Sequence, residues 1–151
     1  YAQYKSIKSD IDKAIANVIA DSAFVGGKYV EILEKQIANY CQTKYAVALN
    51  SGTDALYLSL WALEIGDDDE VITTPFTFIA TAEVIARLGA KPVFADIEKN
   101  SFNINPDAIE AKITKKTKAI IPVHLFGLPA QMDKIKRIAK DEGFNIKING
   151  K

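Results

Sequence analysis

The stretch "EVITTPFTFIATAEVIARLGAKPVFAD", residues 70–96, decides the fold. An apolar run at 70–74 is followed by a helical pattern at 79–89 and by a second apolar run at 91–96. A strand, a helix and another strand in this order predict two parallel strands joined by a helical crossover. Strands that are almost continuously apolar further predict a sheet that is covered by helices on both faces.

The same alternation continues on both sides of this stretch. We expect further strands at 45–49, 118–123 and 144–148, longer helices at 53–65 and 130–143, and a short helix opened by Asn105 and Pro106. The pattern predicts the α/β class, with a mostly parallel sheet and helices on both of its faces.

Two helices are predicted ahead of the sheet. The first has Ser6 as its N-cap, the second runs through 29–41, and each presents one apolar face. The apolar faces consist of Ile7, Ile11, Ile15, Val18 and Ile19 on the first helix and of Val30, Leu33 and Ile37 on the second. We therefore divide the chain into an N-terminal helical segment (1–43), an α/β portion (44–148) and a C-terminal remainder (149–151).

The composition argues against several classes of protein. The 151 residues include 19 basic and 19 acidic ones, and this balance argues against a nucleic-acid-binding or anionic-membrane surface. The dense basic run at 112–118 is better explained as a solvated loop before a strand. Cys41 is the only cysteine and His124 the only histidine, so we expect neither a disulfide nor a zinc site, and a reducing cytoplasm as the setting. No apolar run approaches the roughly 20 residues that cross a bilayer.

The turn "NSGTDAL", residues 50–56, joins an apolar run to a helix. Gly52 permits the close approach of an anion, and Ser51 and Thr53 add hydroxyl donors beside the free N–H groups of the helix start. These features are compatible with a phosphate site. The heptapeptide alone favours the alternative, a plain helix cap formed by Ser51 or Thr53, which Asp54 in the first turn would also support.

Other connections after predicted strands carry further candidates. From its position Phe78 would present its ring to a flat heterocycle, but the residues alone favour Phe76 and Phe78 as core residues beneath the next helix. His124 and Asp96 each follow a strand, and either a functional or a structural hydrogen-bonding role fits them. The sequence contains no GxGxxG after a strand, no GxxxxGK[ST] and no GxSxG, which argues against a dinucleotide enzyme, a P-loop NTPase and a typical α/β-hydrolase.

Five segments carry a resemblance that covers the chain to about residue 148. They are "FVGGKYVEILEKQIANYC" (24–41), "KYAVALNSGTDALYLSL" (44–60), "GDDDEVITTPFTFIATAEVI" (66–85), "GAKPVFADIEKNSFNINPDAIEAKIT" (89–114) and "TKAIIPVHLFG" (117–127). In this order they resemble the DegT/DnrJ/EryC1/StrS family of pyridoxal-phosphate-dependent aminotransferases. The resemblance implies a fold like the large domain of fold-type I aminotransferases, incomplete here, and a homodimer.

The resemblance also implies an activity and a set of site residues. The family transfers an amino group from an amino acid, in most members glutamate, to a nucleotide-linked keto sugar. By similarity, Ser51, Gly52 and Thr53 would hold the phosphate of pyridoxal phosphate, and Phe78 would stack on its pyridine ring. The loop 24–27 lies near the mouth of the substrate site in the family. Cell-surface polysaccharide and antibiotic sugar biosynthesis both fit such an enzyme.

The C-terminal residues depart from the family pattern. After 144–148 the family continues with an acidic segment, whose Asp partners the pyridine nitrogen, and later with a Schiff-base lysine. This sequence instead reads "NGK", 149–151, and Lys151 does not match the context of that lysine. We therefore assign no catalytic residue and no metal ligand within the chain.

Two alternatives to the aminotransferase stay open at this point. One is a sugar dehydratase of the same family that uses pyridoxal or pyridoxamine phosphate. The other is a truncated, non-catalytic α/β module that binds a phosphorylated ligand.

Overall fold

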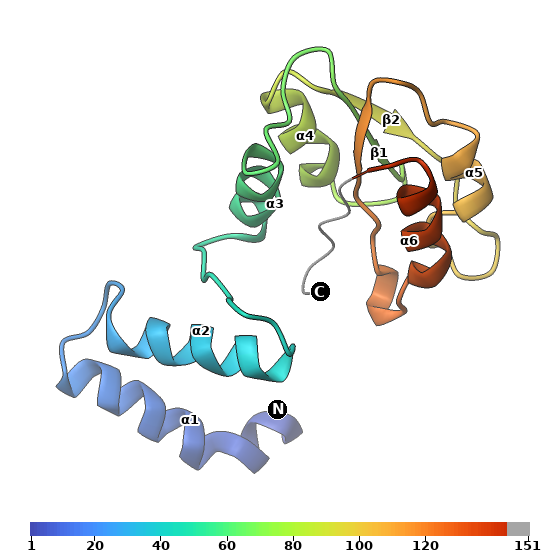
Figure 1. Cartoon of the computed structure of the whole chain (residues 1–151). Helices are drawn as coiled ribbons and strands as arrows, with labels where there is room; N and C mark the ends of the chain where they lie inside the picture. The colour runs from blue at the N-terminus through green and yellow to red at the C-terminus, as the bar shows by residue number, and fades with distance from the viewer. Residues whose placement is uncertain (145–151) are drawn as a thin grey trace. The chain divides into compact units, whose positions relative to one another are not determined.

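The computed structural model describes residues 1–144, which form two compact units, Tyr1–Ala48 and the part from Leu49 onward (Figure 1). The first unit consists of α1 (Ala2–Ala20), α2 (Lys28–Tyr40) and the segments that follow each helix. The second unit holds the sheet and its helices. The strand expected at 144–148 and the segment 149–151 lie outside the described residues, apart from Phe144.

The first helix begins earlier than the sequence predicts. We expected Ser6 to be the N-cap, but α1 starts at Ala2, and the Ser6 hydroxyl donates to the carbonyl of Gln3 at 2.8 Å. Serine inside a helix commonly bonds back to the preceding turn, so its capping chemistry did not mark the start here. The apolar faces of α1 and α2 stay partly exposed within their own unit, with Ile15 at 54% and Ile37 at 45%.

Three parallel strands form the sheet of the second unit, in the order β2-β1-β3. They are β1 (Glu70–Thr73), β2 (Lys91–Phe94) and β3 (Thr117–Ile120). The central strand pairs Ile72 with Val93 on one side and with Ile120 on the other. The parallel strand pair predicted from residues 70–96 is confirmed.

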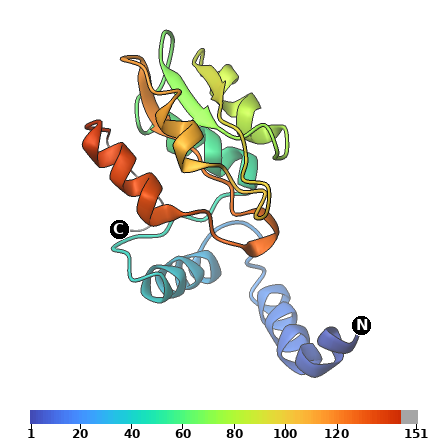
Figure 2. The ribbon, with the colours of Figure 1, turned by 90° about the vertical axis from the view of Figure 1, so that its right-hand side faces the viewer.

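Helices cover both faces of this sheet, as Figure 1 and Figure 2 show. On one face, Val71 packs in a buried cluster with residues of α3 (Gly52–Trp61) and α4 (Ala80–Arg87). On the other face, Ile72 packs in a second cluster with residues of α5 (Pro106–Glu110) and α6 (Met132–Asp141). Neighbouring residues of a strand point to opposite faces, so Val71 of β1 enters one core and Ile72 enters the other. The predicted α/β class with helices on both faces is confirmed.

The strand expected at 45–49 is absent. This segment has no regular structure, and Tyr45 and Val47 are 74% and 75% exposed. The amide N–H of Ala48 donates to the Glu34 carboxylate at 2.8 Å, so a side chain takes the place of a neighbouring strand. An apolar run becomes a strand only when another strand satisfies its backbone groups.

Glu70 links the amino ends of the strands. It is only 7% exposed, and its carboxylate accepts from the Thr114 hydroxyl at 2.6 Å and from the Lys91 ammonium at 3.0 Å. The hydrogen bond from Thr114, followed by that from Lys91, lowers the pKa of Glu70 from its ordinary value. The charged carboxylate is therefore more stable in the folded protein than in the unfolded chain.

This link predicts a pH-dependent contribution to stability. Because the pKa of Glu70 is lowered on folding, its contribution is present above the unfolded pKa of about 4.3 and is lost as the pH falls through the folded value. The difference in unfolding free energy between wild type and Glu70→Gln is expected to be largest near neutral pH and to shrink in acid. Urea titrations across this range measure it, with Glu110→Gln as an exposed control. A difference that does not change with pH would contradict the prediction.

Candidate functional site

The carboxyl ends of all three strands lie at one edge of the sheet, because the strands are parallel. The connections that leave this edge are 74–79 after β1, 95–105 after β2 and 121–131 after β3. In open α/β sheets ligands bind in the crevice beyond this edge. The predicted candidates Phe78, Asp96 and His124 lie in these connections, whereas Ser51, Gly52 and Thr53 lie at the start of α3.

The start of α3 offers an open anion-binding surface. Ser51 is the N-cap, and its hydroxyl oxygen accepts from the Asp54 N–H at 3.0 Å, so the capping alternative is realised. The same hydroxyl still has a proton to donate. No hydrogen bond within residues 1–144 involves the N–H groups of Gly52 and Thr53. A Cβ added at Gly52 would meet no atom within 4 Å, so the space in front of this helix start is free.

Phe78 is presented to solvent. Its side chain is 76% exposed and that of Phe76 is 47% exposed, so neither ring is a core residue. The hydroxyls of Thr77 and Thr81 are hydrogen-bonded at 3.0 Å across the start of α4, which fixes the turn that carries Phe78. The Phe76 ring contacts that of Phe102, with 5.8 Å between centroids. Phe78 thus keeps a free aromatic face beside the end of β1.

His124 and Asp96 both make local hydrogen bonds. The Nδ1 atom of His124 accepts from the Ala130 N–H at 3.1 Å, and the ring is otherwise exposed. The Asp96 carboxylate accepts from the Ile97 N–H at 2.8 Å. Each residue therefore has a structural partner, and His124 keeps its second ring nitrogen for another one.

Asn103 was not predicted from the sequence as a residue of the site. This residue is 3% exposed, and its side-chain amide joins the connection after β2 to the connection after β3. Nothing in the sequence distinguishes Asn103 from Asn100 or Asn105, since asparagine is common in turns.

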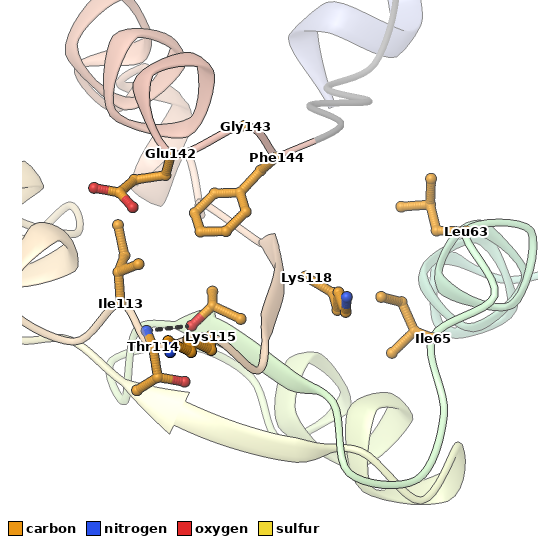
Figure 3. A pocket seen from close by; sticks show the side chains of 10 residues that line it. Leu63, Ile65, Ile113, Thr114, Lys115, Lys118, Glu142, Gly143 and Phe144 are labelled. Carbon is orange, nitrogen blue, oxygen red and sulfur yellow. Dashed lines mark hydrogen bonds between the residues drawn. The ribbon is translucent and has the colours of Figure 1, made fainter.

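A hollow of the second unit lies at the opposite edge of the sheet (Figure 3). It measures about 680 Å³ and is lined by Leu63 and Ile65 after α3, by Thr114 before β3 and by Phe144 after α6. Leu63 and Ile65 precede β1, and Thr114 precedes β3. The hollow is therefore separate from the strand ends that carry the predicted site residues.

The loop 24–27 of the first unit is exposed at its tip and fixed at its base. Phe24 and Val25 are 69% and 95% exposed, and Gly26 and Gly27 have φ of 61° and 74°. The Asp21 carboxylate accepts from the Lys28 ammonium at 2.6 Å and from the Tyr29 hydroxyl, and these bonds lower its pKa.

Within residues 1–144 no group of three His, Cys, Asp or Glu residues is placed to hold a metal ion, and no helix is long and apolar enough to span a membrane.

Comparison with known proteins identifies the family. The model of the DegT/DnrJ/EryC1/StrS aminotransferase family matches residues 5–147. The chain belongs to this family. The sequence resemblance to DegT/DnrJ/EryC1/StrS aminotransferases is thereby confirmed over nearly its full extent.

Individual members of the DegT/DnrJ/EryC1/StrS family are similar in sequence and in structure. A pleiotropic regulatory protein of Geobacillus stearothermophilus is 50% identical over 144 residues, 95% of this chain and 39% of that protein. The UDP-2-acetamido-2-deoxy-3-oxo-D-glucuronate aminotransferase of Pseudomonas aeruginosa is 44% identical over 144 residues, 95% of this chain and 40% of that protein. The crystal structure of NtdA from Bacillus subtilis with the bound cofactor PMP superposes with a TM-score of 0.86 at 37% identity, covering 92% of this chain and 32% of that one. The chain thus spans about two fifths of the length of these two relatives.

Removal of the Ser51 cap is expected to destabilise α3. Ser51→Ala leaves the Asp54 N–H without its acceptor and is expected to lower the unfolding free energy by about 1 kcal/mol. Chemical denaturation measures the change. The control is Ser59→Ala, an exposed serine of the same helix, for which we expect less than about 0.5 kcal/mol. Equal effects of the two substitutions would mean that the cap contributes nothing specific.

Proposed function

We propose that the full-length protein is a pyridoxal-phosphate-dependent aminotransferase that acts on a nucleotide-linked keto sugar. The observation that carries this proposal is the start of α3, where two unpaired N–H groups and the Ser51 hydroxyl face open space. Family membership and the named P. aeruginosa aminotransferase support the same activity. The start of α3 would serve a sugar dehydratase or a phosphate-binding module equally well, and the named P. aeruginosa aminotransferase is what favours amino transfer.

The residues present fit a phosphate-bearing aromatic cofactor. Gly52 and Thr53 donate their backbone N–H groups to the phosphate, and the Ser51 and Thr53 hydroxyls add donors. The positive end of the α3 dipole favours the same anion. Phe78 holds the plane of the ring through its exposed face. When bound, pyridoxal phosphate supplies the electron sink for reaction at the substrate carbon, and these residues hold it in place.

The remaining parts of the proposal concern partners and setting. The amino donor is an amino acid, glutamate by family habit, and the protein works as a cytoplasmic homodimer. The catalytic lysine and the carboxylate for the pyridine nitrogen are assigned to no residue of the 151.

The activity is tested with the full-length protein, pyridoxal phosphate, glutamate and a panel of UDP-, dTDP- and GDP-linked keto sugars. Release of 2-oxoglutarate detects amino transfer.

Gly52→Val tests the phosphate site. A Cβ added at this position meets no protein atom within 4 Å, so the valine side chain has room to enter the space that the phosphate needs. We expect at least about a tenfold loss of affinity for pyridoxal phosphate, with little change in melting temperature. Titration of the cofactor absorbance measures the affinity, and Ser59→Val places the same side chain on an exposed position of α3 as a control. Unchanged affinity in Gly52→Val would remove the phosphate assignment.

Phe78→Ala tests the stacking role. Loss of the ring is expected to weaken cofactor binding about threefold to tenfold, the scale of one aromatic stacking contact. Phe78→Trp keeps a flat ring and is expected to bind nearly as well as wild type. Because the side chain is 76% exposed, neither change should lower stability appreciably. Equal affinity of the alanine and tryptophan variants would show that the ring does not contact the cofactor.

A further inference from the structure

Asn103 joins two connections that leave the carboxyl edge of the sheet. Its Oδ1 atom accepts from the Leu125 N–H at 2.9 Å, and its Nδ2 atom donates to the Leu128 carbonyl at 3.0 Å. The side chain is 3% exposed, so these bonds are shielded from water. One buried amide thereby fixes both ends of the short 3₁₀ turn η1 (Leu125–Gly127).

The connection after β2 holds Asn103 in turn. The N–H of Asn103 donates to the Ser101 hydroxyl oxygen at 3.2 Å, and that hydroxyl donates to the Glu98 carboxylate at 2.9 Å. The other oxygen of Glu98 accepts from the side-chain amide of Gln131. The two connections are therefore linked at two places, by Asn103 and by Glu98.

The turn that Asn103 fixes presents two exposed rings, those of His124 and Phe126. Phe126 is 90% exposed and has φ of 53°, a conformation that bulky residues adopt only when their surroundings impose it. His124 precedes the turn, and its Nδ1 atom already accepts from Ala130. In the neutral ring the proton is therefore on Nε2, which leaves a hydrogen-bond donor free.

These groups lie toward a different face of the sheet from the proposed cofactor residues. Ile104 and Ala130, which flank the linked segments, belong to the core cluster beneath α5 and α6. Ser51 and Phe78 instead precede α3 and α4, which cover the other face. Phe78, His124 and Phe126 all lie in connections that leave the carboxyl edge of the sheet, where ligands of open α/β sheets bind. His124 and Phe126 are therefore candidates to contact the part of a ligand that Phe78 does not hold.

We propose that Asn103 is a positioning residue that holds η1 so that His124 and Phe126 contact the nucleotide-linked sugar. This inference rests on the proposed function. It assigns Asn103 to substrate affinity rather than to cofactor affinity, because neither of its bonded partners belongs to the turns at Ser51 or Phe78.

The test compares Asn103→Ala with Asn100→Ala, an exposed asparagine of the same connection, in the full-length enzyme loaded with pyridoxal phosphate. With the keto sugar that the wild type accepts, Asn103→Ala is expected to raise KM about tenfold and to change kcat less than about threefold. Cofactor affinity is expected to stay within about threefold of wild type. Hydrogen exchange of the segment 121–131 is expected to accelerate, because the Leu125 N–H loses its acceptor. Asn100→Ala should behave as wild type.

Each outcome bears on a defined part of the inference. Faster exchange together with a raised KM for the sugar supports it. An unchanged KM in an active Asn103→Ala enzyme overturns it, as does an equal loss of sugar and cofactor affinity, which would indicate a general structural role. Absence of turnover by the wild type with every sugar of the panel overturns the proposed function and the substrate role together. In that case the exchange rate still reports whether Asn103 holds η1.

Discussion

Complete burial of the central strand is the constraint on which the second unit depends. Val71 and Ile72 are both fully buried and point to opposite faces of β1, so each face needs its own apolar cover. Parallel neighbours require crossover connections, and helices in those connections supply the cover. The same geometry brings three strand ends to one edge, and the connections that leave it carry exposed side chains such as Phe78 and Phe126.

The sequence predicts those helices and strands whose own residues carry an apolar period or a capping side chain. The strands of 70–96 and the helices around them carry apolar periodicity and, at Asn105, a side chain that caps α5 as expected. The segment 45–49 has the same apolar composition and forms no strand, because strand formation also depends on a neighbour that composition does not reveal. The prediction of Ser6 as an N-cap was wrong for a related reason. A serine hydroxyl can cap a helix or bond to the preceding turn inside one.

The candidate site divides in the same way. Ser51, Gly52 and Thr53 drew attention because a small, hydroxyl-rich turn before a helix fits either a cap or a phosphate site, and the family resemblance favoured the phosphate. The exposure of Phe78 could not be predicted, because an aromatic residue after a strand is compatible with burial or with exposure to solvent. The role of Asn103 could not be predicted from the sequence, because its hydrogen-bond partners lie far along the chain. Its two hydrogen bonds are properties of the fold rather than of the local sequence.

The span of these bonds has a consequence for the order in which the chain folds. Asn103 is separated by 22 residues from Leu125 and by 25 from Leu128. The strands before these partners, β2 and β3, do not pair with each other, and both must dock on β1 before the bonds can form. Closing such a loop costs entropy that only the assembled sheet offsets. The surface that we assign to the substrate is therefore completed late in folding, after both cores are in place.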